Sequence, residues 1–305
     1  MWEKLGLIYG PNDPKSWASN SSLTPTPFLH SKKVIRVYAG FRDTFGISRI
    51  GYVDVCAEDP TRLLRVSQKP VLDLGVPGTF DDNGVMPGEV IRVGSRILMY
   101  YTGFQLTKKI KFQAFTGLCE SFDNGETFTR VQKTPVLDRA PEALHIRTLH
   151  TAIYEQGLFK VWYVGGSEWI QIGGKDYASY KIFDMESSDG ISFGPKGRVA
   201  LNFDAKKGEY RIGRPRVNWV EGQYQMTFTF SDVNGVVNSG YATSKDGKVW
   251  IRDDPSLGII PSSFGWDSES INYPYRLTAG DNTYLFYCGK NLGFEGFGCA
   301  RLKSK

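Results

Sequence analysis

Cysteine and histidine are scarce in this 305-residue sequence. Its four cysteines, Cys56, Cys119, Cys288 and Cys299, do not follow the spacing of a metal-binding motif. We therefore expect buried free thiols. There are only 3 histidines, too few to complete a metal site with the neighbouring residues. We predict neither a metal site nor a cofactor.

Long apolar runs are also missing. No stretch is long enough to cross a membrane, so we expect no membrane span. The first residues, Met1-Trp2-Glu3-Lys4, lack the apolar segment of a signal peptide, and we expect a chain in the reducing cytoplasm. The net charge of +5 comes from scattered lysines and arginines, so no nucleic-acid partner is expected. The sequence leaves the oligomeric state open.

Aromatic residues make up 14% of the chain, and they recur in a pattern. An aromatic pair followed by glycine, or a close variant of it, returns every roughly 60 residues, and such a period indicates a repeated supersecondary unit. The copies begin at Val37, Tyr100, Trp162, Thr227 and Phe286. Five copies fill the chain.

Each copy has the ordered features of four strands. Its strand segments are rich in β-branched and aromatic residues, and no stretch has the periodicity of a helix. Hairpin turns of the Asp-Gly type, with or without an intervening residue, follow the third strand at 121–125, 187–190 and 244–247. We predict an all-β fold, a five-bladed β-propeller spanning residues 1–305 as one domain.

The last repeat has no fourth strand before the chain ends. Trp2-Glu3-Lys4 resembles Trp250-Ile251-Arg252 and Phe128-Thr129-Arg130, which open the fourth strand in other copies. We predict that Trp2 to Tyr9 completes the last blade and thereby covers an open sheet edge.

The first strand of each blade lines a central channel, so we look for the site there. We assign these strands to 23–29, 83–91, 147–155, 213–220 and 269–277. Asp81 and Asp82 precede the second of them. Adjacent residues point to opposite faces of a strand, and we choose Asp82 as the channel carboxylate, the alternative being a turn cap.

The fifth inner strand begins with a second acidic group. Glu269 follows Trp266, which suits a general acid beside a ring on which a sugar stacks, although a surface carboxylate is the simpler alternative. Asp43, next to Arg42 after the second strand of the first repeat, is a further candidate carboxylate.

Basic residues surround the expected mouth of the channel. Arg147 and His150 lie in the third inner strand, and Arg211, Arg214 and Arg216 in or beside the fourth. Together with Arg42, these guanidinium groups suit an anionic substrate, because they bind carboxylate or phosphate in bidentate fashion.

The segments 78–87, 100–104, 214–215 and 273–275, together with Arg36-Val37-Tyr38, resemble the five-bladed propeller glycosidases of glycoside hydrolase families 32 and 43 and their relatives. The similarity is greatest to glycosidase-like proteins found with bacterial surface-polysaccharide genes. The resemblance implies a carboxylate pair that acts on a sugar, with Asp82 as base or nucleophile and Glu269 as acid. Asp81 or Asp43 would then balance the charge. From their positions near the expected mouth of the channel, we further predict that Arg42, Arg147, His150, Arg214, Trp266 and Tyr273 bind the substrate. The first inner strand lacks the acidic residue that those families have there.

We therefore expect a glycoside-active enzyme: a hydrolase, a phosphorylase or a transferase. A non-catalytic propeller that binds a carbohydrate or another partner is the main alternative. A six-bladed sialidase-like enzyme is the third, because 121–128 has the spacing of that family's Asp-box.

Overall fold

The computed structural model describes residues 1–11, 13 and 15–303, and its regular structure is almost entirely β-strand. Consecutive strands pair antiparallel in units of four. The first unit is β2 (Asn20–Ser31), β3 (Val34–Arg42), β4 (Ser48–Cys56) and β5 (Leu63–Val66). The second is β6 (Val85–Val93), β7 (Arg96–Leu106), β8 (Phe112–Ser121) and β9 (Thr129–Arg130). The third is β10 (Ile146–Glu155), β11 (Leu158–Ile172), β12 (Lys175–Ser187) and β13 (Arg198–Leu201).

The remaining units follow the same plan. The fourth is β14 (Glu209–Val220), β15 (Gln223–Asp232), β16 (Val237–Ser244) and β17 (Ile251–Arg252). The fifth contains β18 (Asn272–Ala279), β19 (Asn282–Cys288), β20 (Phe297–Leu302) and β1 (Trp2–Tyr9). Three short 3₁₀ turns are the helical elements of the described residues: η1 (Ala205–Lys207), η2 (Asp254–Leu257) and η3 (Lys290–Gly293).

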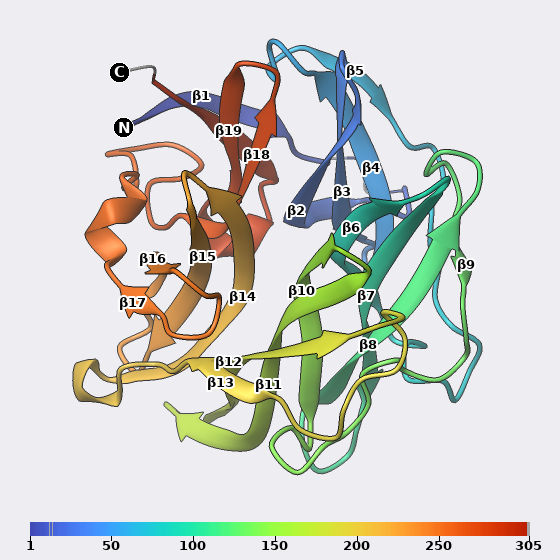
Figure 1. The fold of residues 1–305 in the computed structure, drawn as a ribbon, viewed down its shortest axis with the longest axis vertical. Coiled ribbons are helices and arrows are strands. Elements are labelled where there is room, and N and C mark those ends of the chain that lie inside the picture. Colours follow the sequence, from blue (N-terminus) through green and yellow to red (C-terminus); the bar gives the residue numbers. More distant parts are fainter. Residues whose placement is uncertain (12, 14, 304–305) are drawn as a thin grey trace.

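The inner strands of these units lie around a common centre (Figure 1). β2 contacts β6, β6 contacts β10, β10 contacts β14, β14 contacts β18, and β18 contacts β2. Parallel pairing of β8 with β10 and of β12 with β14 joins three units into a twelve-stranded sheet. Hydrogen bonding between strands does not continue around the whole ring in the described part of the chain, so the arrangement is propeller-like without one closed sheet.

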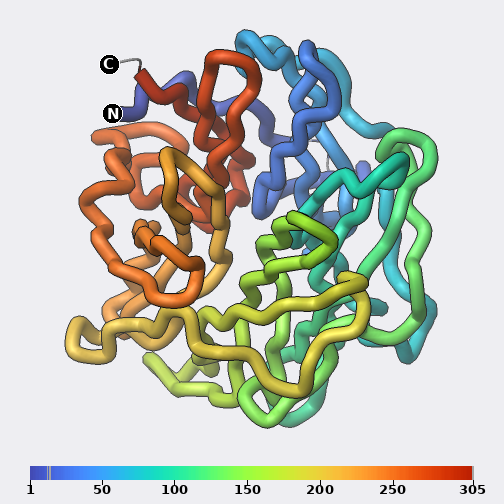
Figure 2. Tube along the Cα trace, in the orientation of Figure 1, coloured from blue at the N-terminus to red at the C-terminus, as the bar shows by residue number. Residues whose placement is uncertain are grey.

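The first and last strands, β1 and β20, lie side by side in the fifth unit (Figure 2). β1 pairs antiparallel with β20, from Trp2 opposite Leu302 to Tyr9 opposite Phe297. The Trp2 indole donates to the carbonyl of Leu257 at 2.8 Å, which fixes β1 to the fourth unit as well. β1 is thus an outer strand of a four-stranded sheet in the order β1-β20-β19-β18.

The units are joined by buried side chains and by turns. Four hydrophobic clusters each combine strands of two neighbouring units. The predicted Asp-Gly turns have glycine at positive φ, and each turn packs on the preceding unit. Tyr38 donates to the Gly125 carbonyl at 3.1 Å, and Tyr100 donates to the Gly190 carbonyl at 2.7 Å.

No helix in the described residues is long and apolar enough to cross a membrane. The four cysteines are free and buried.

Candidate functional site

A cavity of about 250 Å³ lies where the inner strands approach one another, and we call it the central cavity. It is lined by side chains of the inner strands β6, β10, β14 and β18, and of β3, β7, β8, β11 and β12. Four predicted substrate-binding residues line it: Arg42, His150, Arg214 and Tyr273. The other lining residues are Met86, Thr102, Phe104, Phe112, Ala114, Ile146, Thr148, Val164 and Tyr180. The wall therefore combines aromatic rings, hydroxyl groups and two guanidinium groups.

A bulge in each inner strand shapes the centre of the ring. The register shifts at 23/26 in β2, 87/89 in β6, 149/151 in β10, 213/216 in β14 and 272/275 in β18. Thr24, Arg214 and Tyr273 have left-handed backbone at these bulges, with φ of 54°, 55° and 54°, and a proline follows each of them. This conformation is strained for a side-chain-bearing residue, and such strain concentrates at functional sites. Bulges re-aim side chains, and two of these three residues line the central cavity.

The two guanidinium groups of the cavity have no carboxylate partner among the described residues. Arg214 donates to the Pro87 carbonyl at 3.1 Å and lies 5.5 Å from the centre of the Tyr273 ring. Burial, and then the neighbouring Arg216, lower the pKa of Arg214 to about 10. Burial also lowers the pKa of Arg42, whose Nε is buried without a partner in the described part of the chain. Both groups remain cationic at neutral pH.

His150 connects Arg214 to a hydroxyl of the wall. Its Nδ1 lies 3.4 Å from Arg214 Nη1, and its Nε2 lies 2.9 Å from Thr148 Oγ1. Burial and the charges of Arg214 and Arg216 lower the pKa of His150 well below its ordinary value, so the ring is neutral. Because Arg214 can only donate, Nδ1 accepts and Nε2 carries the proton. Thr148 Oγ1 accepts that proton in a hydrogen bond, which leaves its own O–H free to donate.

The predicted acids Asp81 and Asp82 do not line this cavity. The Asp81 carboxylate accepts from Tyr101 at 2.9 Å and pairs with Arg130 at 2.7 Å. One oxygen of Asp82 accepts from the Gly78 N–H at 2.8 Å, and its other oxygen is buried without a partner among the residues described.

The Asp81 arrangement repeats in the fifth unit. Asp267 accepts from Tyr287 at 3.0 Å and pairs with Lys4 of β1 at 2.7 Å. Trp266 stacks on Tyr287, with ring centroids 5.0 Å apart, and does not line the central cavity. A Cβ at Gly289 would lie 2.1 Å from the Trp266 carbonyl oxygen, which explains why the recurring motif ends in glycine there. Trp266 is thus packed within its own unit.

Asp43, Arg147 and Glu269 also lie outside the cavity lining. Asp43 pairs with Arg49 at 2.8 Å and accepts from two backbone N–H groups. Burial opposes ionisation of Asp43, but these hydrogen bonds outweigh it and lower its pKa. Arg147 donates to the carbonyls of Asp138 and Gly194, and Glu269 is exposed before β18 begins.

Glu89, a buried carboxylate of β6, was not among the site residues predicted from the sequence. It accepts from Tyr275 at 2.6 Å and from the Val90 N–H at 2.9 Å, and Arg216 Nη1 lies 3.7 Å away. Burial raises the pKa of Glu89. Arg216 also donates to the carbonyls of Gly88 and His150, so this pair supports the bulges beside the cavity. Its position within the predicted inner strand 83–91 was the available indication, because an acidic residue in an inner strand must find a partner.

The ring of four-stranded units is shared with glycoside hydrolases of known structure. A thermostable family-43 glycoside hydrolase superposes with a TM-score of 0.70 at 16% identity, over 95% of this chain and 92% of that chain. A structure of the GH130 family, described as mannoside phosphorylases that contain glycoside hydrolases targeting β-1,2 mannosidic linkages in Candida mannan, gives 0.70 at 14% identity, over 99% and 94%. A glycosyl hydrolase from Bacteroides ovatus gives 0.75 at 13% identity, over 99% and 94%. At these identities the likeness shows the fold.

The sequence itself has a relative over its whole length. The uncharacterized protein Rv1502 of Mycobacterium tuberculosis is 30% identical over 307 residues, which cover 99% of each chain. The chain belongs to the same family as Rv1502. No protein-family model matches the chain.

Proposed function

We propose that this protein is a glycoside-active enzyme, a hydrolase, phosphorylase or transferase, that holds an anionic sugar in the central cavity. The observation that carries the proposal is the pair of half-buried guanidinium groups, Arg42 and Arg214, without carboxylate partners among the described residues, beside the ring of Tyr273. Buried charge is unfavourable unless it is paired, so a ligand that brings negative charge stabilises this wall. Aromatic faces suit the apolar face of a sugar ring. The fold shared with glycoside hydrolases adds support.

We also propose that the five units are the blades of a five-bladed propeller in which β1 closes the last blade. The contacts of the inner strands around the ring and the pairing of β1 with β20 support this arrangement. The cytoplasmic location expected from the sequence stays a prediction, and so does the relation to polysaccharide biosynthesis in bacteria.

For the chemistry, we propose Asp82 as base or nucleophile and Glu269 as acid. Asp82 has a buried oxygen free of partners in the described part of the chain, and the next residue, Asn83, donates its N–H to the carbonyl of Phe104, a lining residue. Glu269 is exposed, and it precedes the strand that carries Tyr273. Asp81 and Asp43 are already paired with arginines, which suits a role in charge balance. A glycosidase needs its two carboxyl groups about 5–5.5 Å apart for retention or roughly 6.5–9.5 Å apart for inversion.

The test is turnover of a panel of nitrophenyl glycosides and uronides, and of sugar 1-phosphates with acceptor sugars. Asp82→Asn and Glu269→Gln keep shape but remove proton transfer, and each is expected to lower kcat by roughly 10²–10⁴-fold. Asp281→Asn and Glu155→Gln, at exposed positions away from the cavity, are the matched controls. Full activity in both site variants would reject the carboxylate pair.

A non-catalytic carbohydrate-binding protein is the second candidate, because no carboxylate of the described residues lines the central cavity. Binding of sugars without turnover of any member of the panel would favour it.

A further inference from the structure

We propose that the central cavity binds a phosphate dianion, either on a sugar phosphate or as free phosphate, in preference to a sugar carboxylate. This inference rests on the proposed function in taking the central cavity as the substrate site, and it names the anion that the site accepts.

Two cationic side chains of the central cavity have no anionic partner among the described residues. Arg42 and Arg214 line the cavity without a carboxylate from the described residues, whereas Arg216, next to Arg214, is balanced by Glu89. Arg211 adds a further cation behind the wall: it lies 5.8 Å from the ring of Tyr180 and donates to Ser231 at 3.0 Å. At least two positive charges in or beside the cavity are therefore not neutralised by a carboxylate of the described residues. A phosphate monoester carries about 1.5 to 2 negative charges at pH 7, whereas a carboxylate carries one.

Several hydrogen-bond donors of the cavity wall lack an acceptor among the described residues. Within the described residues, Arg42 Nε and Thr102 Oγ1 are buried without partners, and Thr102 is 2% exposed. The Thr148 hydroxyl is free to donate, because His150 already donates to its oxygen. A ligand that accepts hydrogen bonds from Thr148 and from the guanidinium groups of Arg42 and Arg214 must be rich in acceptors. A phosphate monoester offers three strong acceptor oxygens and a carboxylate offers two.

The Arg214 side chain is held in place before any ligand binds. Arg214 is held at φ 55° before Pro215, and its guanidinium is fixed by the Pro87 carbonyl and by His150. A fork of N–H donors that is already oriented loses little entropy when it binds a planar or tetrahedral oxyanion. The cavity of about 250 Å³ is small for a ligand pocket, which suits a single phosphorylated monosaccharide.

The test is titration calorimetry of the whole protein with inorganic phosphate, glucose 1-phosphate, glucose 6-phosphate, glucuronate and glucose at one ionic strength. We expect at least one phosphate-bearing probe to bind at least tenfold more tightly than glucuronate. Comparison of inorganic phosphate with the two sugar phosphates tells which source the site prefers. Arg42→Gln and Arg214→Gln are expected to weaken phosphate binding tenfold or more.

Arg96→Gln, which removes an exposed arginine paired with Glu120, is the control and should bind as the wild type does. If Arg214→Gln does not fold, Thr148→Val tests the same site, with an expected loss of threefold or more. Equal or tighter binding of glucuronate, or no binding of any phosphate-bearing probe, would overturn the inference. Turnover of a glycoside without binding of phosphate would support the proposed function and reject this inference. Binding of phosphate without turnover of any glycoside would support this inference and reject the proposed enzymatic function.

Discussion

Glu89 and Arg216 form a buried ion pair that supports the backbone beside the central cavity. Arg216 reaches two inner strands at once, through the carbonyls of Gly88 and His150, and it donates to Thr26 of a third at 3.0 Å. Removing one partner of a buried pair leaves the other charge uncompensated, which costs about 3–5 kcal/mol. We expect Arg216→Met to lower the free energy of unfolding by this amount in urea denaturation, and the double variant Arg216→Met/Glu89→Met to recover part of the loss.

The exposed pair of Arg96 and Glu120 is the control, and Arg96→Met should change the free energy of unfolding by about 1 kcal/mol or less. A loss in Arg216→Met no larger than in this control would show that Glu89 is satisfied without the arginine.

Only some residues of the candidate site can be predicted from the sequence. It indicates Arg42, His150, Arg214 and Tyr273 as substrate-binding residues, and all four line one cavity. The choice among the carboxylates depends on strand parity and on proximity to an aromatic residue. Neither property shows which side chain of the folded unit pairs with a given carboxylate. Asp81 is held by Tyr101 and Arg130, which follow it by 20 and 49 positions. Such partners emerge only when the strands are assembled.

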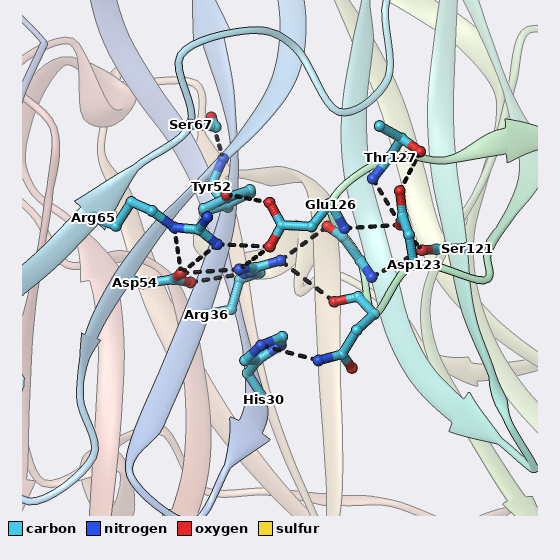
Figure 3. Close-up of polar contacts among 12 residues, drawn as sticks. His30, Arg36, Tyr52, Asp54, Arg65, Ser67, Ser121, Asp123, Glu126 and Thr127 are labelled. Carbon is cyan, nitrogen blue, oxygen red and sulfur yellow. Dashed lines mark hydrogen bonds and ion pairs between the residues drawn. The ribbon is translucent and has the colours of Figure 1, made fainter.

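Between the first two units, a network of charged side chains attaches the predicted turn 121–125 to β3 and β4 (Figure 3). Arg36 is fully buried, pairs with Asp54 at 2.7 Å and Glu126 at 2.8 Å, and lies 3.7 Å from the centre of the Tyr52 ring. Arg65 and Tyr52 also bind Glu126, at 2.6 and 2.8 Å. The aspartate and glycine of this turn predict the turn from the sequence, but the sequence does not show which arginines the turn contacts.

This network predicts a specific acid sensitivity. Burial opposes ionisation of Glu126, but hydrogen bonds from Arg36, Arg65 and Tyr52 outweigh it and lower its pKa to about 2. A depressed pKa adds stability above the unfolded value of about 4.3, and that stability is lost as the pH falls towards 2. We expect Glu126→Gln to be less stable than the wild type at pH 7, with the difference shrinking between about pH 4 and pH 2, as followed by thermal unfolding. Glu155→Gln serves as the control, and a difference that is constant with pH would contradict the assignment.

For the molecule as a whole, the repeat is sufficient to predict the order of the strands. Each inner strand overlaps the segment assigned to it, from β2 to β18. The reason is that the period of the aromatic motif and the Asp-Gly turns are local features, and the strand order within a unit follows from short antiparallel connections. The bulges, which decide what faces the central cavity, depend on how five strands crowd the centre, and the sequence does not reveal them.

From the pairing of β1 with β20 we predict that the stability of the whole ring depends on β1. Deleting Trp2–Tyr9 would expose the edge of β20, leave Asp267 without Lys4, and remove the indole that binds the Leu257 carbonyl. Because the ring brings the fifth unit against both the first and the fourth, we expect a lower melting temperature for the entire domain in one transition, together with aggregation through the open edge.

The single variant Lys4→Met, which keeps the strand, should show a smaller loss. A synthetic peptide of residues 1–11 added to the truncated protein should restore much of the melting temperature, and a scrambled peptide should not. An unchanged melting temperature after deletion would mean that β1 is a dispensable addition to the fold.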